Sequence, residues 1–274
     1  MDLKNPFDFS GRVAVVTGGT GVLCGTLARA LGACGARVAV LGRNMEKADR
    51  VVAEIRDRGG EAIPVKADVT DSSSVKAAAG QVLDTFGRVD ILINGAGGAR
   101  KEATTGDDLS FFDLPDDALS WVFDLNCLGT IRCSQAFARP MVDQDAGCIL
   151  NISSMGGFQP LTRSIAYSAA KAAVNNFTQW LAVHIAQEYS PHIRVNAIAP
   201  GFFMTEQNRF FLIDPATGSL TKRAQTIVAN TPMGRFGRPE ELIGTTLWLL
   251  SDGASFVHGA VIPVDGGFSA FGGV

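Results

Sequence analysis

The segment VAVVTGGTGVLCGTLARAL, residues 13–31, decides the fold. It begins with an apolar run of strand length, passes through a turn rich in glycine, and continues in a helical pattern. Glycines in such a turn let the backbone approach a pyrophosphate closely, and the N-terminus of the next helix favours its negative charge. The segment therefore predicts a dinucleotide-binding unit. We expect the cofactor to be contacted here by Gly18, Thr20, Gly21, Val22 and Leu23.

Strand-length apolar runs alternate with longer helical patterns along the rest of the chain. The expected strands are 12–17, 37–41, 62–65, 89–94, 147–153, 193–197 and 260–264. The expected helices are 22–34, 45–58, 72–86, 114–142, 165–189 and 239–251. Runs rich in Val and Ile without alternation are typical of parallel strands that are covered on both faces. The pattern predicts an α/β fold: one domain over residues 1–274, with a Rossmann-type doubly wound parallel sheet of about seven strands and helices on both faces.

Composition excludes several functional classes. Hydrophobic residues make up 46% of the 274 residues, charged residues 19%, and the net charge is -3. No basic stripe points to nucleic acid, and no apolar run or leader segment points to a membrane or to secretion. The five cysteines form no CxxC pair and the three histidines do not cluster with them. We therefore expect no metal site and a cytoplasmic protein.

The ends of later strands predict the rest of the cofactor site. After the second strand stands Arg43, followed by Asn44, where an acidic residue would favour NAD. A guanidinium suits a 2′-phosphate, so we expect NADP, with NAD as the alternative. Further cofactor contacts are expected after the third and fourth strands. They are Asp68, Val69, Asn94, Ala96 and Gly97.

The segment YSAAK, residues 167–171, places a tyrosine four residues before a lysine. Residues four apart lie on the same face of a helix, and a helix that also included Arg163 would form a column of cation, phenol and cation. An ammonium one turn away favours the phenolate, and an oxidised nicotinamide acts in the same direction. Tyr167 is therefore the candidate that exchanges a proton with a carbonyl or hydroxyl oxygen.

An ordered set of motifs resembles the short-chain dehydrogenase/reductase family. The set is TGG at 17–19, Asp68, NGAG at 94–97, Asn126, Ser154, YSAAK at 167–171, PG at 200–201 with Thr205, and DGG at 265–267. One departure concerns the glycine turn, where the family has glycine at the positions of Val22 and Cys24. The resemblance implies catalysis by Asn126, Ser154, Tyr167 and Lys171. It also implies cofactor contacts at Tyr167, Lys171, Pro200, Gly201, Phe203 and Thr205.

Longer runs, above all 151–211, resemble the D-mannonate oxidoreductase (fructuronate reductase) subgroup of that family. The resemblance implies an NAD(P)-dependent enzyme that interconverts D-fructuronate and D-mannonate. Another polyol or keto-gluconate reductase, or a non-catalytic dinucleotide sensor, remains the alternative. The family also implies a homotetramer or homodimer.

A sugar-acid substrate needs a cation for its carboxylate. The chain offers Arg100, Arg163 and Arg209 for this role. The other expected substrate contacts are Ser154, Met155 and Asn208. Residues 202–235 interrupt the alternation of strands and helices, and we expect them to form a lid over the substrate.

Overall fold

The computed structural model describes residues 5–205, 209 and 212–273. Seven parallel strands form a single sheet in the order β3-β2-β1-β4-β5-β6-β7. The strands are β1 (Val13–Thr17), β2 (Arg37–Gly42), β3 (Glu61–Lys66), β4 (Ile91–Asn94), β5 (Gly147–Ile152), β6 (Ile193–Pro200) and β7 (Val261–Val264). The predicted doubly wound parallel sheet is confirmed, with strand ends shifted by up to three residues.

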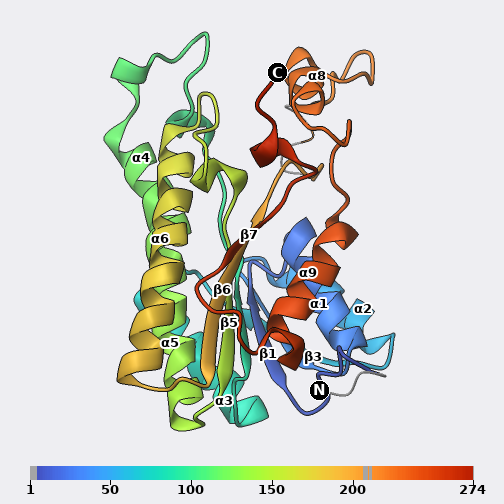
Figure 1. Ribbon diagram of the computed structural model, residues 1–274, viewed down its shortest axis with the longest axis vertical. Coiled ribbons are helices and arrows are strands. Elements are labelled where there is room, and N and C mark those ends of the chain that lie inside the picture. Colours follow the sequence, from blue (N-terminus) through green and yellow to red (C-terminus); the bar gives the residue numbers. More distant parts are fainter. Residues whose placement is uncertain (1–4, 206–208, 210–211, 274) are drawn as a thin grey trace.

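Helices cover both faces of the sheet (Figure 1). One face carries α1 (Val22–Ala33), α2 (Met45–Arg56) and α9 (Ile243–Leu250). The other carries α3 (Ser72–Phe86), α5 (Gly129–Asp143) and α6 (Ile165–Glu188), and α4 (Asp116–Phe123) precedes α5. Among the described residues, no helix is long and apolar enough to cross a bilayer.

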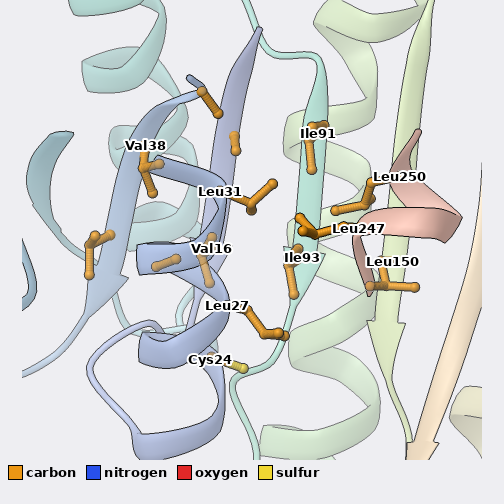
Figure 2. Packing of buried hydrophobic residues seen from close by; sticks show 14 of the residues in the cluster. Val16, Cys24, Leu27, Leu31, Val38, Ile91, Ile93, Leu150, Leu247 and Leu250 are labelled. Atoms are coloured by element: carbon orange, nitrogen blue, oxygen red, sulfur yellow. The ribbon is translucent and has the colours of Figure 1, made fainter. Parts of the chain in front are cut away.

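The face under α1 shows how the sequence builds the core. Leu27 and Leu31 of α1 point at the strands, and Ile93 lies beneath them (Figure 2). These side chains are at most 1% exposed. On the same face, Leu247 and Leu250 of α9 pack beside Leu150 (Figure 2). Such burial contributes roughly 1.5–3 kcal/mol for each large side chain, which fixes the glycine turn between β1 and α1 in place.

The sheet order reverses between β1 and β4, because β2 and β3 lie on one side of β1 and β4 to β7 on the other. In open parallel sheets, ligands bind at the carboxyl ends of the strands where the order reverses. Both motifs expected to hold the cofactor, the turn after β1 and the turn after β4, therefore meet at this point. Their residues converge although 76 positions separate Thr17 from Ile93, to which its hydroxyl donates.

The single helix expected over 114–142 is divided. A π-helical turn, Asp124–Leu128, separates α4 from α5. Such turns insert an extra residue and are frequent at functional sites. The loop before α4 contains two short 3-10 turns, Lys101–Ala103 and Phe111–Asp113.

The described residues between 202 and 235 include a small separate hydrophobic cluster. They include the helix α8 (Lys222–Ala229), which is capped by the Thr221 side chain. Leu212, Ala224 and Ile227 are buried together and form the core of this cluster. In Figure 1, α8 lies at the same end of the molecule as the start of α6, beside the last residues of the chain.

Candidate active site

The glycine turn approaches the loop after β4 with no room for side chains. Gly18 has φ +64, and a Cβ there would lie 2.7 Å from the Gly95 carbonyl oxygen. The Thr17 hydroxyl accepts the N–H groups of Gly95 and Ala96 at 3.0 and 3.2 Å. Thr17 was not predicted as a site residue, although a hydroxyl at a strand end is the type of group that could join two loops in this way.

Cys24 replaces a glycine of the family's pattern, and a glycine on the facing loop makes room for its side chain. Cys24 stands where the family has glycine, and its thiol is buried. A Cβ on Gly95 would lie 2.1 Å from the Cys24 Sγ. The extra side chain on α1 is therefore accommodated by a residue without one on the facing loop.

The N-terminus of α1 is suited to an anion. It begins at Val22, and Gly21 gives no side-chain cap. No acidic residue stands in the first turn. The N–H groups of a first helical turn have no partner within the helix, and the helix dipole adds positive charge there. The turn can hold a pyrophosphate, as the sequence predicts.

A pocket of about 290 Å³ lies beyond this turn. It is lined by Arg43, Lys66, Ala67, Asp68, Ser74 and Ala77. Thr70 donates to the Asp68 carboxylate at 3.0 Å through its N–H and at 2.7 Å through its hydroxyl. Burial acts to raise the pKa of Asp68, but these bonds and the charge of Arg43 outweigh it and lower the pKa. Lys66 was not predicted as a cofactor contact. The signal that could have found it is its position at the end of β3, which pairs with β2.

Not every predicted cofactor residue directs its side chain to this pocket. The Asn44 Oδ1 accepts the Lys47 N–H at 2.9 Å and caps α2. Val69 is buried, and a Cβ on Gly129 would lie 2.7 Å from it. The side chain of Asn44 therefore has a structural task, and Val69 packs against the start of α5.

Lys171 and Tyr167 lie one turn apart on α6. The Lys171 Nζ is 5.7 Å from the centroid of the Tyr167 ring and donates to the Ile152 carbonyl oxygen at 2.8 Å. Burial lowers the pKa of Lys171 to about 8. Burial also raises the pKa of Tyr167, although the hydrogen bond with Ser154 acts in the opposite direction. In the protein alone, the phenol thus stays protonated at neutral pH.

The third predicted member of the column is displaced. Arg163 has φ +74, and α6 begins only at Ile165. The expected helical column of Arg163, Tyr167 and Lys171 is therefore realised for Tyr167 and Lys171 alone.

Ser154 and Met155 follow β5. The Ser154 Oγ accepts the Gly156 N–H at 3.1 Å and is bonded to Tyr167. The Met155 side chain is 1% exposed and packs inside the protein, and its contact with a substrate stays a prediction. Ser154 and Tyr167 are thus brought together by the 3-10 turn Met155–Gly157 and the start of α6.

Asn126 lies at the centre of the π-helical turn and is fully buried. Its Nδ2 donates to the carbonyl oxygens of Gly98 and Val122, each at 2.8 Å. A Cβ on Gly97 would lie 2.6 Å from the Asn126 Oδ1 and 3.2 Å from the Lys171 Nζ. The π-helical turn thus places Asn126 beside Lys171 and against the loop after β4.

A buried polar network supports this arrangement. The Asn94 Nδ2 donates to the Ser134 Oγ at 3.0 Å and to the Asn151 Oδ1 at 2.9 Å. The Asn151 Nδ2 in turn donates to the Thr178 Oγ1 at 2.9 Å. Asn94, predicted as a cofactor contact, therefore joins β4 and β5 to α5 through side chains that are almost fully enclosed.

The residues after β6 close the site from the other side. The Gly201 N–H donates to the Val264 carbonyl at 3.0 Å, and a Cβ on Gly201 would meet Asp265 at 2.7 Å. Phe203 is 5% exposed and packs against Gly237. Pro200 thus ends β6, and Gly201, Phe203 and Thr205 follow it at the carboxyl edge of the sheet. Asn208 lies outside the described residues.

The predicted carboxylate ligands differ in their surroundings. The Arg100 guanidinium stacks over Trp121, 5.0 Å from the ring centroid, and pairs with Glu102 at 3.5 Å. Arg163 pairs with Asp107 at 3.4 Å and is half exposed. Arg209 is exposed. Within the described part of the chain, no group of three His, Cys, Asp or Glu side chains could hold a metal ion.

Known proteins share this architecture. A family model described as enoyl-(acyl carrier protein) reductase matches residues 23–269. The uncharacterized oxidoreductase UxuB of Bacillus subtilis (strain 168) is 48% identical over 97% of this chain and 98% of its own. The structure of a proposed D-mannonate oxidoreductase of Haemophilus influenzae with bound NAD is 45% identical, with a TM-score of 0.91, and the match covers 97% of this chain and 98% of that one.

A third similar structure is a proposed NAD(P)-dependent gluconate 5-dehydrogenase of Beutenbergia cavernae with bound NADP at low occupancy. It is 34% identical with a TM-score of 0.84, over 97% of this chain and 99% of that one. The glycine turn, the pocket at Arg43 and the Ser154–Tyr167–Lys171 group match what a nicotinamide cofactor requires. The chain is an NAD(P)-dependent oxidoreductase, and it belongs to the short-chain dehydrogenase/reductase family.

Proposed function

We propose that the protein reduces the ketone of a keto sugar acid, D-fructuronate, to the hydroxyl of D-mannonate, and catalyses the reverse oxidation. The observation that carries the chemistry is the group of Ser154, Tyr167 and Lys171 beside the loop after β4, in which Ser154 and Lys171 are buried and Tyr167 is partly buried. The substrate is supported by the likeness to the proposed D-mannonate oxidoreductase of Haemophilus influenzae.

The chain's residues supply the proton and the geometry. The bound cofactor supplies or accepts the hydride. In reduction, the Tyr167 hydroxyl donates its proton to the carbonyl oxygen, and the Ser154 hydroxyl, bonded to that phenol, orients the same oxygen. In oxidation, the hydroxyl of the substrate returns its proton to Tyr167.

Burial of Tyr167 favours its role in reduction, because the raised pKa keeps the phenol protonated and able to donate. In the second direction the positive charge of an oxidised nicotinamide would favour the phenolate. The Lys171 ammonium, on the same side of α6, adds to that effect when it is protonated. The π-helical turn with Asn126 holds the loop against which the nicotinamide would lie.

The test is the consumption of reduced cofactor with D-fructuronate. Wild-type protein should reduce it, and Tyr167→Phe should lose roughly 10²–10⁴-fold in turnover while it binds the cofactor normally. Tyr189→Phe is the matched control, because Tyr189 is 61% exposed at the end of α6. Turnover at the wild-type rate in Tyr167→Phe would remove that residue from its proposed role.

A second substrate class has support of its own. The Beutenbergia cavernae structure is a proposed gluconate 5-dehydrogenase, so 5-keto-D-gluconate is the alternative substrate. It also carries a ketone four bonds from its carboxylate carbon, and only the configuration along the chain differs. A kcat/KM at least tenfold higher for 5-keto-D-gluconate than for D-fructuronate would favour the alternative.

For the cofactor we propose a preference for NADP. Arg43 and Lys66 line the same pocket, and two cations there suit a 2′-phosphate. The proposed D-mannonate oxidoreductase holds NAD and the proposed gluconate 5-dehydrogenase NADP, so both cofactors occur among similar structures. Residues 202–235 are proposed to close over the substrate as a lid.

We further propose that the protein acts as a homotetramer or homodimer in the cytoplasm. Large apolar side chains are exposed along α4 and α6, among them Phe123 (38%), Trp180 (55%) and Val183 (57%). Trp180 also stacks on His184, 4.7 Å between centroids, on the same surface. Light scattering after size exclusion gives the mass, and a monomer at micromolar concentration would contradict the proposal.

A further inference from the structure

The helix that carries Asn126 runs through the π-helical turn without a break. Helix α4 ends at Phe123, the turn covers Asp124–Leu128, and α5 begins at Gly129. The backbone stays in the right-handed helical region on both sides, with φ -65 at Phe123 and φ -58 at Gly129. The turn therefore inserts one residue into a continuous helix. Because π-helical turns are rare, contacts of side chains have to hold the insertion at this place.

Arg132 of α5 joins the two sides of the turn. Its Nη2 donates to the Asp124 Oδ1 at 2.7 Å. The two side chains are only 23% and 30% exposed, so solvent screens their attraction less than that of a surface pair. The Nη1 of Arg132 also donates to the Val69 carbonyl oxygen at 3.3 Å. One guanidinium therefore connects the first residue of the turn, helix α5 and the loop after β3.

The spacing of this ion pair matches a helix that contains one inserted residue. Asp124 and Arg132 are eight positions apart. In a regular α-helix, eight residues turn through about 800°, which leaves the two side chains about 80° apart around the axis. With one residue taken up by the π-helical turn, the pair behaves like residues seven apart, about 20° from alignment. Side chains on a helix also point toward its N-terminus, where Asp124 lies. The ion pair thus favours the helix with the π-helical turn over a regular one.

The loop after β3 supplies a rigid second acceptor for the guanidinium. Gly129 is the first residue of α5, and a Cβ there would lie 2.7 Å from the Val69 Cγ2. The missing side chain lets Val69 pack directly against the helix, where it is 6% exposed. Packing therefore fixes Val69, and its carbonyl oxygen holds Arg132 in the direction of Asp124.

The register of the turn decides where the Asn126 amide points. In the observed register the amide bonds to Gly98 through both its Nδ2 and its Oδ1. A shift by one residue would rotate Asn126 by about 100° around the helix axis and break both bonds. We propose that Arg132 is a positioning residue which, together with Asp124, selects the π-helical register and so keeps Asn126 on Gly98. This inference rests on the proposed function, in which Asn126 holds the loop against which the nicotinamide would lie.

A second ion pair on α5 provides a matched control. Arg139 and Asp143 are four residues apart, and their closest N and O atoms are 3.9 Å apart. The side chains are 82% and 67% exposed, and both residues lie in the regular part of the helix. This pair shares the helix and the type of charges with Arg132 and Asp124, but it does not span the inserted residue. An effect common to Arg132→Gln and Arg139→Gln would therefore report the charge of α5 and not the register.

The first measurement needs neither cofactor nor substrate. Hydrogen exchange of the Gly98 N–H, followed by NMR, reports whether the Asn126 Oδ1 still accepts it. Arg132→Gln should accelerate this exchange by roughly 10-fold or more, and Arg139→Gln should leave it within about twofold of wild type. Asp124→Ala should act like Arg132→Gln. Because alanine is the best helix former, this second variant removes the ion pair without a loss of helix propensity.

The second measurement shows whether the register affects the reaction. Arg132→Gln should raise KM for the cofactor by roughly 3- to 10-fold, as expected for one lost hydrogen bond, and lower kcat by roughly 10- to 100-fold. In the Asn126→Ala background, where no amide remains to be placed, the same substitution should change kcat by less than about twofold. A purely structural role would lower kcat by the same factor in both backgrounds.

Four outcomes separate the inference from the proposed function. Exchange of the Gly98 N–H at the wild-type rate in both Arg132→Gln and Asp124→Ala would overturn the inference and leave the proposed function intact. Equal acceleration in Arg139→Gln would also overturn it, as would an undiminished loss of kcat in the Asn126→Ala background. Failure of wild-type protein to reduce any keto sugar acid would overturn the proposed function, whereas the exchange of Gly98 would still decide whether Arg132 sets the register.

Discussion

The side chain of Asn126 holds the backbone of Gly98 from two directions. Its Nδ2 donates to the Gly98 carbonyl oxygen at 2.8 Å, and its Oδ1 accepts the Gly98 N–H at 3.0 Å. One buried amide thus replaces the partners that a strand would have given to this loop. The loop contains Gly97, which lies between Asn126 and Lys171. Its shape therefore depends on a residue 28 positions away in the chain.

Removal of the Asn126 amide should disturb cofactor binding as well as turnover. Asn126→Ala leaves the N–H and C=O of Gly98 without these partners, at a cost of roughly 1–3 kcal/mol for a buried group. We expect a higher KM for the cofactor, lower kcat and a lower melting temperature. Asn230→Ala, at an exposed helix end, is the control. If kcat alone falls, the loop does not need the two hydrogen bonds from Asn126 to keep its shape.

Two adjacent glycines provide a sharp steric comparison. A Cβ at position 97 would lie 2.6 Å from the Asn126 Oδ1, whereas at position 98 it would meet nothing within 4 Å. Gly97→Ala should therefore cost roughly 1–3 kcal/mol of stability and displace the Lys171 ammonium, with a large loss of activity. Gly98→Ala should keep both the stability and the activity of the wild type. Thermal unfolding and steady-state kinetics test the pair, and equal behaviour of the two variants would contradict this account.

The sequence was sufficient for the fold and for the closeness of Tyr167 to Lys171, because those signals are local. A strand, a glycine turn and a helix are contiguous in residues 13–31, and Tyr167 and Lys171 are one helical turn apart. The number and direction of the strands followed from the alternation of apolar runs.

The features that the sequence did not predict depend on contacts between residues that are far apart in the chain. The division of the helix over 114–142 by a π-helical turn gives no pattern of its own, because an inserted residue only shifts the helical period. The positive φ of Arg163 arises where Thr105 bonds to its carbonyl, 58 positions away. The burial of Met155 likewise depends on packing that the sequence does not show.

Lys171 makes the activity sensitive to alkaline pH. Burial lowers its pKa from 10.5 to about 8, so the ammonium is present below about pH 8 and is lost as the pH rises further. The value of kcat/KM for the reduced cofactor reports groups of the free enzyme. It should therefore be constant below pH 8 and fall above it. Lys171→Met should be much less active, with no change in this window.

The control for the pH profile is Lys76→Met, on the exposed side of α3. It should keep both the rate and the decline above pH 8. If the decline persists in Lys171→Met, another group is responsible for it. The melting temperatures of both variants, measured across the same range, show whether unfolding contributes to the decline.

The pocket beside Asp68 should decide between the two cofactors. Arg43 and Lys66 both line it, and each can contribute a charge-assisted contact to a 2′-phosphate. Arg43→Ala and Lys66→Ala should each lower kcat/KM for NADPH by roughly 10- to 100-fold, since a hydrogen bond to a charged group contributes about 1.5–3 kcal/mol. NADH lacks that phosphate, so its kcat/KM should change by less than about threefold. Arg50→Ala, exposed on α2, is the control. Equal losses with NADPH and NADH would mean that Arg43 binds a part that the two cofactors share. A preference of the wild type for NADH would show that the two cations in this pocket do not select the 2′-phosphate.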